Sequence, residues 1–349
     1  MRRVLVRGAA IVAIGAVLVG LEMAPPRGST PASAEIYLCP EASPLPSEGV
    51  TRIAGANRFE TAIAISRLNM RTTGICDLHI ASGDTFPDAL AASAGSPAST
   101  PLLLVPQSYL PQSVRREIRR LDPNYIQLFG GRSAISQGVH DDLAGYVDGR
   151  VGTHWGLNRY DTAAQATWHL SPRRPVFIAS GTNFPDAIAG SPLIGANQGA
   201  LLLVSKFSIP AETRNALRLL RPTQIIVLGG TGAVSASVQS RLDEYTSGSV
   251  TRISGADRYA TAVAISERYE SEGTVFIVSG TNYPDALALG PLARALRGAI
   301  LLVERDTIPD AVRQELQRLR PHSIRIVGGG SAVSAEVEAE LQQYIVERP

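Results

Sequence analysis

The sequence predicts an α/β protein made of three tandem Rossmann-like modules, each a small parallel sheet flanked by helices. Two observations carry this prediction: one block of sequence occurs three times, and apolar strand-like segments alternate with helical ones inside each block. The Ser-Gly motif at Ser82 returns at Ser180 and Ser279, so each repeat is roughly 100 residues long, enough for a small domain. We therefore expect three similar units.

The third repeat displays the order of elements most clearly. Its strand-like segments are short and apolar throughout, which is typical of a parallel sheet covered by helices on both faces. Pro284 stands where a helix would begin, and Pro321 follows the end of another. We expect strands at 250–253, 275–278, 300–303 and 324–327, and helices at 259–268, 284–295, 309–319 and 335–344.

The chain begins with the pattern of a secretory signal peptide. Three arginines precede an apolar run at residues 8–21, and small residues follow up to Ala34. This run is shorter than the ~20 residues that span a bilayer, so we expect cleavage after Ala34 and no membrane attachment afterwards. The expected division is a signal peptide at 1–34, a tail at 35–48, and repeats at 49–148, 149–247 and 248–349.

Composition is that of a globular protein, with 44% hydrophobic and 18% charged residues. Loss of residues 1–34 would remove four arginines and one glutamate and bring the net charge from +2 to −1. A chain without a surplus of basic residues is not expected to bind nucleic acid strongly. Cys39 and Cys76 both lie on the exported part, where a disulfide between them can persist, although two unpaired thiols are the alternative.

Polar residues recur where strands are expected to end. In the first repeat they occupy residues 55–58, 82–85 and 130–133. The carboxyl ends of parallel strands share one edge of the sheet, where ligands usually bind, so three repeats predict three candidate sites.

Each repeated charged residue also has a structural interpretation. Arg58, Arg159 and Arg258 could pair with an aspartate of their own repeat. Asp88, Asp186 and Asp285 could cap the helix in which they stand. The glycine pairs at 130–131, 229–230 and 328–329 could form tight turns or bind an anion through backbone amides.

The sequence offers no repeated catalytic group. It has no Walker loop, no zincin histidine pair and no Gly-x-Ser-x-Gly elbow, and its five histidines do not recur between repeats. We expect neither a metal cluster nor a cofactor. Three copies of one edge without a repeated nucleophile and base indicate binding through avidity rather than catalysis, so we expect no enzyme activity.

The repeated motifs resemble the cell wall-binding repeat type 2 (CWB2) family. They are Arg-Ile-x-Gly-x-x-Arg-[Phe/Tyr]-x-Thr-Ala, Ser-Gly-x-x-[Phe/Tyr]-Pro-Asp-Ala-[Leu/Ile], Leu-Leu-Leu-Val and a closing Gly-Gly, and they extend over about residues 51–344. The resemblance implies pseudo-Rossmann modules in a three-lobed arrangement with approximate threefold symmetry. It also implies a secreted surface protein of Gram-positive bacteria that is held on the wall non-covalently.

The leading hypothesis is binding of an anionic wall polysaccharide or teichoic-type polymer. The arginines would contact phosphate or carboxylate groups, and polar side chains would bond hydroxyls. The candidate residues are Arg58, Arg159, Arg258, Asn57, Asn158, Thr85, Asn183, Asn282, Asp88, Asp186 and Asp285. The alternatives are a wall-active hydrolase of amidase or glycosidase type that uses the aspartates as acid or base, and a surface-layer or protein-interaction scaffold.

Overall fold

The structure, a computed structural model, describes residues 48–347 except 71, 99, 149, 155, 168 and 269–272. These residues all belong to one compact unit, Cys39–Pro349. The predicted signal peptide, nearly all of the predicted tail and Cys39 lie outside the described residues. Over the part of the chain that is described, no helix combines the length and apolar character needed to cross a membrane.

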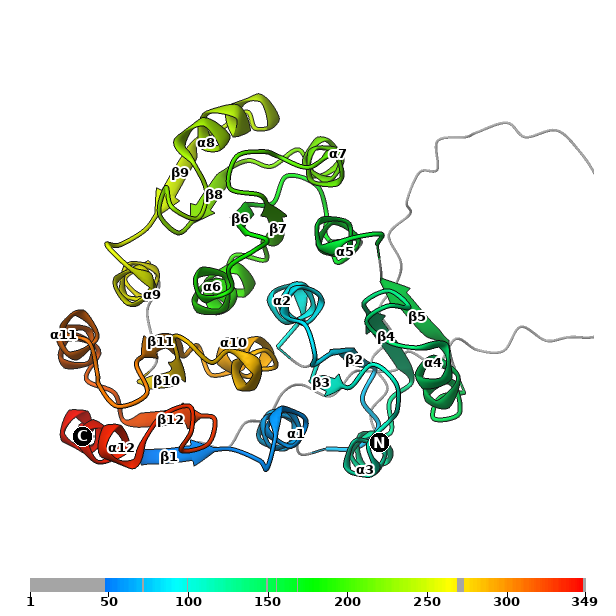
Figure 1. Cartoon of the computed structure of the whole chain (residues 1–349), viewed down its shortest axis with the longest axis horizontal. Coiled ribbons are helices and arrows are strands. Elements are labelled where there is room, and N and C mark those ends of the chain that lie inside the picture. The colour runs from blue at the N-terminus through cyan, green and yellow to red at the C-terminus, as the bar shows by residue number, and fades with distance from the viewer. Residues whose placement is uncertain are drawn as a thin grey trace, which may run out of the picture. The chain divides into compact units, whose positions relative to one another are not determined.

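The elements follow the predicted order in all three repeats (Figure 1). Repeat 1 contains β1 (Gly49–Ile53), α1 (Arg58–Asn69), β2 (Asp77–Ser82), α2 (Phe86–Gly95), β3 (Leu102–Val105), α3 (Gln112–Leu121), β4 (Tyr125–Phe129) and α4 (Gln137–Ala144). Repeat 2 contains β5 (Val151–His154), α5 (Arg159–Gln165), β6 (Val176–Ser180), α6 (Pro185–Ala196), β7 (Ala200–Val204), α7 (Ala211–Leu220), β8 (Ile225–Leu228), α8 (Ala236–Leu242) and η1 (Asp243–Tyr245). Repeat 3 contains β9 (Val250–Ile253), α9 (Arg258–Ser266), β10 (Thr274–Ser279), η2 (Pro284–Ala286), α10 (Gly290–Ala295), β11 (Ala299–Val303), α11 (Asp310–Leu319), β12 (Ser323–Val327), α12 (Ala335–Leu341) and η3 (Gln342–Tyr344).

Two expected helices of repeat 3 differ in detail. The predicted helix at 284–295 is divided into the short 3₁₀ turn η2 and the helix α10. Pro291 lies in the first turn of α10, where a residue without an amide hydrogen is tolerated. The predicted helix at 335–344 is α-helical up to Leu341 and ends in the 3₁₀ turn η3.

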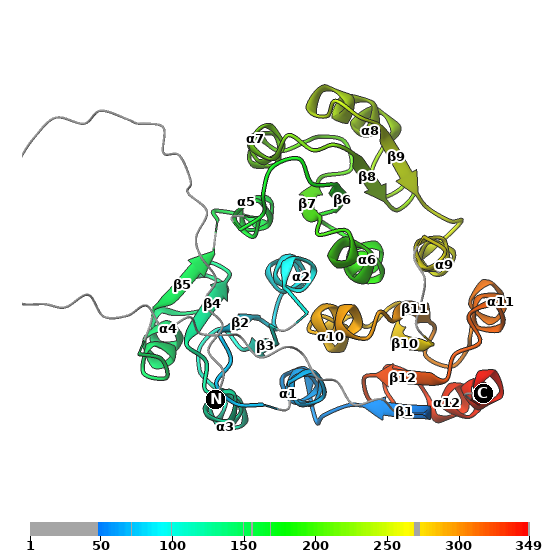
Figure 2. The same ribbon diagram turned by 180° about the vertical axis from the view of Figure 1, so that it is seen from behind.

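Each sheet is parallel and takes its fourth strand from another repeat. The orders are β3-β2-β4-β5 and β7-β6-β8-β9, so the first strand of each following repeat completes the sheet of the preceding one. The third sheet has the order β1-β12-β10-β11. There β1 pairs with β12, with Val50 opposite Ile324 and Ile53 opposite Val327, and both views show the two strands side by side (Figures 1 and 2). Repeat 3 is thereby joined back to repeat 1.

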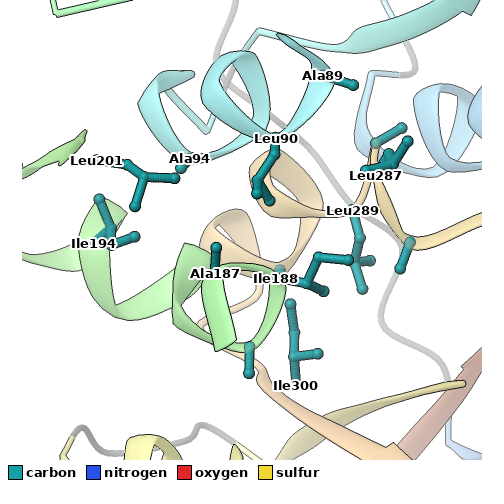
Figure 3. Close-up of a cluster of buried hydrophobic side chains, with 14 of the residues drawn as sticks. Ala89, Leu90, Ala94, Ala187, Ile188, Ile194, Leu201, Leu287, Leu289 and Ile300 are labelled. Atoms are coloured by element: carbon teal, nitrogen blue, oxygen red, sulfur yellow. The ribbon is translucent and has the colours of Figure 1, made fainter. Parts of the chain in front are cut away.

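The buried side chains form one shared core and three separate ones. The shared core lies between α2, α6 and α10, which contact one another and occupy the centre of the three sheets in Figure 1. Leu90, Ile188 and Leu289 meet there, one from each repeat (Figure 3). The opposite face of each sheet has its own core, exemplified by Ile80 in repeat 1 and Ile178 in repeat 2. Three similar sheets around one core give the predicted threefold arrangement.

Candidate functional site

The strand exchange places each candidate site between two repeats. We call junction 1 the place where the strand-end loops of repeat 1 meet the start of α5 in repeat 2. A cavity of about 180 Å³ lies there, lined by Asp88 and Gly131 of repeat 1 and by Asn158, Arg159 and Thr162 of repeat 2. The polar segments therefore meet at the carboxyl ends of the strands, as expected, but the segments come from two repeats.

The aspartates are buried beside arginines of the following repeat. Burial raises the pKa of Asp88, while a hydrogen bond with Thr162 and the charge of Arg159 oppose the rise. At junction 2, between repeats 2 and 3, burial raises the pKa of Asp186 to about 6, opposed by the charge of Arg258. These two carboxyl groups thus have their charged neighbour in the next repeat, not in their own.

Junction 3 joins repeat 3 to repeat 1. The helix α1, which begins at Arg58, contacts the turn η2 that carries Asp285. Asp285 is half-buried, and its carboxylate lies close to Gly328. The same set of elements therefore meets at all three junctions.

Each repeated arginine is anchored to the backbone of its own repeat. Arg58 Nη1 donates to the carbonyl of Gly83 at 2.5 Å, and Arg159 Nη1 donates to the carbonyl of Gly181 at 2.5 Å. Arg258 makes the same bond to Gly280. One N–H of each guanidinium fixes its position, and the described residues form no ion pair with any of the three arginines. The remaining donors suit an anionic group.

The first glycine of each closing pair is required by the aspartate. Gly130, Gly229 and Gly328 have φ values of 120°, 94° and 113°, which L-residues with a side chain rarely adopt. A Cβ at these positions would also press on the carboxylate of Asp88, Asp186 or Asp285. The turn interpretation therefore holds for the first glycine, which lets the carboxylate approach the strand end.

The predicted asparagines at the helix starts are caps. Asn57 Oδ1 accepts hydrogen bonds from the amides of Phe59 and Glu60 at 3.0 and 3.1 Å. Asn158 Oδ1 caps α5 in the same way, and its Nδ2 donates to Glu212 Oε1 at 3.0 Å. These carbonyl oxygens are occupied, which weakens the expectation that they bond a ligand.

Thr85, Asn183 and Asn282 remain open to a ligand. They lie in the loops that follow β2, β6 and β10. Thr85 is the N-cap residue of α2 but makes no side-chain capping bond. Thr85 and Asn282 are exposed, and Asn183 is half-buried. Their side-chain polar atoms have no hydrogen-bond partner within the described residues.

The aromatic residues of the repeated motif meet one another. Phe86, Phe184 and Tyr283 have ring centroids separated by 6.0, 5.5 and 4.4 Å. The guanidinium of Arg159 lies 5.7 Å from the centre of the Phe86 ring. The three junctions therefore surround one aromatic cluster, and at junction 1 the arginine contacts that cluster.

Sequence reasoning missed two kinds of residue at the junctions. Thr61, Thr162 and Thr261 are buried and accept a hydrogen bond from the amide of Gly55, Gly156 and Gly255, respectively. Arg52 and Arg252 donate to the carbonyls of Gly328 and Gly229 in the neighbouring repeat. The repeated motif contains both kinds of residue and could have indicated them. The threonines stand three residues after each junction arginine, and Arg52 and Arg252 are the first residues of the motif.

The sequence analysis also made predictions about metal sites and a disulfide bond. Within the described ranges, no group of three or more His, Cys, Asp or Glu side chains could hold a metal ion. Cys76 is disulfide-bonded. Because Cys39 lies outside the described residues, its pairing with Cys76 stays a prediction.

The repeats match a known family. The family model of cell wall binding domain 2 (CWB2) matches residues 52–140, 154–239 and 252–338. The chain belongs to the CWB2 family. CWB2 modules bind the cell wall, so the three repeats associate this chain with the wall.

Two curated relatives from Bacillus subtilis (strain 168) resemble the CWB2 chain. The N-acetylmuramoyl-L-alanine amidase LytC is 28% identical over 306 residues, which cover 86% of this chain and 60% of the relative. The amidase enhancer is 29% identical over 292 residues, which cover 83% of this chain and 40% of the relative. The CWB2 chain thus spans about half the length of these relatives.

Solved structures share the CWB2 fold. Cwp6 from Clostridium difficile matches with a TM-score of 0.79 at 22% identity, over 86% of this chain and 48% of that one. Cwp8 from Clostridium difficile matches with a TM-score of 0.76 at 21% identity, over 86% and 53%. The α/β fold of three repeats is therefore shared with Cwp6 and Cwp8.

Proposed function

We propose that the protein binds an anionic wall glycopolymer at its three repeat junctions and is held on the wall by that contact. The main support for this proposal is the geometry shared by Arg58, Arg159 and Arg258. One hydrogen bond to a glycine carbonyl fixes the position of each guanidinium group. A fixed guanidinium with uncommitted donors suits phosphate or carboxylate groups, because it can form two parallel charge-assisted hydrogen bonds. Polysaccharides with acidic groups and teichoic-type polymers both carry such groups.

The neighbouring polar groups support a sugar-containing ligand. Thr85, Asn183 and Asn282 offer sugar hydroxyls their hydroxyl and amide groups, which have no hydrogen-bond partner among the residues that the structure describes. The half-buried rings of Phe86, Phe184 and Tyr283 lie between the junctions and add apolar surface. A polymer that reaches more than one junction would gain from effective concentration, since each further contact is intramolecular.

The aspartates favour binding over hydrolysis. A glycosidase uses two carboxyl groups that flank one bond. Among the described residues that line the cavity at junction 1, Asp88 is the one that carries a carboxyl group. We infer that the described repeats have a binding role.

Export of the chain across the membrane is part of the same proposal. The signal peptide predicted at residues 1–34 would place the chain outside the membrane, where a wall polymer is accessible. The two relatives, named as an amidase and an amidase enhancer, extend well beyond the part that matches this chain. The proposed role of these repeats is therefore wall binding alone.

The test is co-sedimentation of residues 35–349 with purified walls of the source species. Walls are used before and after acid extraction of the secondary polymers, across a salt series. We expect binding to be lost on extraction and to weaken with salt, because exposed ionic contacts are screened. Binding that survives extraction would overturn the polymer assignment in favour of peptidoglycan.

A matched pair of triple variants tests the junctions themselves. The junction variant carries Arg58→Gln, Arg159→Gln and Arg258→Gln. The control carries Arg116→Gln, Arg241→Gln and Arg268→Gln, which changes exposed arginines, one in each repeat, by the same total charge. We expect the junction variant alone to lose wall binding with an unchanged circular dichroism spectrum. Equal loss in both variants would mean that net charge, not the junction geometry, determines binding.

A further inference from the structure

A second charged hollow lies in repeat 2, at the amino ends of the strands. This cavity of about 520 Å³ is separate from the junctions, which lie at the carboxyl ends. Arg173 precedes β6, and Arg218 and Arg221 lie at the end of α7. These residues, with Thr223 and Tyr245, line what we call the arginine pocket.

Arg173 adopts a backbone conformation that the other repeats give to glycine. Its φ is 66°, and its amide donates to the carbonyl of Leu220 at 2.8 Å. In repeat 1, Gly74 has a φ of 72° and donates to the carbonyl of Leu121 at 2.9 Å. In repeat 3 the corresponding residue is Gly273, with a φ of 78°. Residues with a side chain are uncommon in this left-handed region, and the arginine at this position adds a guanidinium group to the lining of the cavity.

The concentration of arginine is specific to repeat 2. Arg218 corresponds to Arg119 in repeat 1 and to Gln317 in repeat 3, from their places in α7, α3 and α11. The helix-ending residue Arg221 corresponds to Asp122 and Arg320 in the same elements. In repeat 3 the ring of His322 fills the space that a side chain at position 273 would need. The other two repeats therefore lack the three-arginine arrangement.

The three arginines of the pocket, Arg173, Arg218 and Arg221, form no ion pair within the described residues. Arg218 is held over the ring of Tyr245 at 5.7 Å and donates to Asn215 Oδ1 at 3.3 Å. The guanidinium groups of Arg173 and Arg221 have no hydrogen-bond acceptor in the described part of the chain. Glu244 is the one carboxylate among the lining residues, so the pocket keeps a positive excess.

We propose that the arginine pocket binds the phosphoryl group of a phosphorylated sugar. Arginine forks match the tetrahedral oxygens of phosphate, and several of them compensate its second negative charge. The cavity is larger than a phosphate group and falls within the range of small-molecule sites, so it leaves room for a sugar ring. The Tyr245 ring and the Thr223 hydroxyl also line the cavity; this hydroxyl donates to the carbonyl of Arg173 at 3.4 Å and keeps its capacity to accept a hydrogen bond. The pocket shares no residue with the junctions, so this proposal does not rest on polymer binding there.

The test is calorimetric titration of residues 35–349 with glucose 1-phosphate at low ionic strength. The pocket variant carries Arg173→Gly and Arg221→Asp, the residues that repeat 1 holds at these positions and therefore compatible with the fold. We expect at least about a tenfold loss of affinity, because charge-assisted hydrogen bonds are among the strongest in proteins. The control variant carries Arg116→Gln and Arg241→Glu, which makes the same change in charge on exposed helix positions and is expected to retain affinity within about twofold.

Further titrations identify the recognised chemistry. Inorganic phosphate should bind more weakly than glucose 1-phosphate, and glucose should show no binding at the same concentrations. Equal affinity for the two phosphates would overturn recognition of the sugar. Wild-type affinity in the pocket variant, or equal loss in the charge-matched control, would overturn the site. Wall co-sedimentation of the pocket variant is measured in parallel, so failure of polymer binding at the junctions is detected separately.

Discussion

The carbonyl of Ile53 accepts a hydrogen bond from the amide of Gly328 at 2.9 Å, although the two residues belong to the first and third repeats. The bond is part of the β1–β12 pairing that joins the two ends of the repeat array. Junction 3 lies beside this pairing, because α1 follows β1 and contacts the turn η2 that carries Asp285. The stability of that contact and the presence of a third site are therefore linked.

Arg52→Ala should destabilise the β1–β12 contact. Arg52 forms a 2.7 Å ion pair with Glu338 and donates to the Gly328 carbonyl at 2.8 Å, both across the repeat boundary. Loss of this partly buried set should reduce the free energy of unfolding by about 2–3 kcal/mol, measured by chemical denaturation. The control Arg305→Ala removes an exposed ion pair with Asp306 and should cost under about 1 kcal/mol. Similar costs for the two variants would contradict the closing role of Arg52.

Gly229→Ala should be far more damaging than Gly230→Ala. Gly229 has a φ of 94°, and a Cβ there would overlap the carboxylate of Asp186. The substitution should cost about 2–4 kcal/mol through backbone strain and displacement of the aspartate. A Cβ at Gly230 meets no atom within 4 Å, so that substitution should change stability by about 0.5 kcal/mol or less. Thermal unfolding of the two adjacent variants makes the comparison.

Asp186→Asn should change the pH dependence of stability. Burial raises the pKa of the folded-state carboxyl from 3.8 to about 6, so the folded protein binds this proton more tightly than the unfolded chain. Stability from this group is therefore fully present below about pH 4 and is lost as the pH rises through about 6. Relative to the wild type, the variant should gain up to about 3 kcal/mol between pH 4 and pH 7.5. Denaturation at both pH values tests this, with exposed Asp243→Asn as a control that should show no such difference.

Phe184 and Tyr283 should be energetically coupled. Their rings come from different repeats and have centroids 4.4 Å apart. A double-mutant cycle with Phe184→Ala and Tyr283→Ala should give a coupling free energy of about 0.5–1.5 kcal/mol. The cycle of Phe184→Ala with Tyr245→Ala, whose ring packs in the separate outer core of repeat 2, should give about zero. Absence of coupling in the first cycle would argue against the aromatic cluster as a contact between repeats.

Much of the fold could be predicted because the information is local and repeated. Apolar strands such as residues 300–303 and amphipathic helices such as 309–319 have clear periodicity, and three copies confirm the same order of elements. Parallel pairing follows from that alternation, since parallel strands need a crossover helix. The positions of Asp88 and Arg159 after strand ends were also readable, because they depend only on where each strand stops.

The partners of those residues could not be predicted from the same information. β5 pairs with β4 of the preceding repeat and β1 pairs with β12, and these choices depend on how three sheets bury one common core. A strand of repeat 1 and its equivalent in repeat 2 have similar residues, so local pattern does not distinguish a repeat's own sheet from its neighbour's. The repeated modules, their elements and the edge that carries the polar residues can thus be predicted from the amino-acid pattern. That Asp88 lies beside Arg159 of the next repeat could not be, because the strand exchange between repeats, not distance along the chain, sets which loops meet.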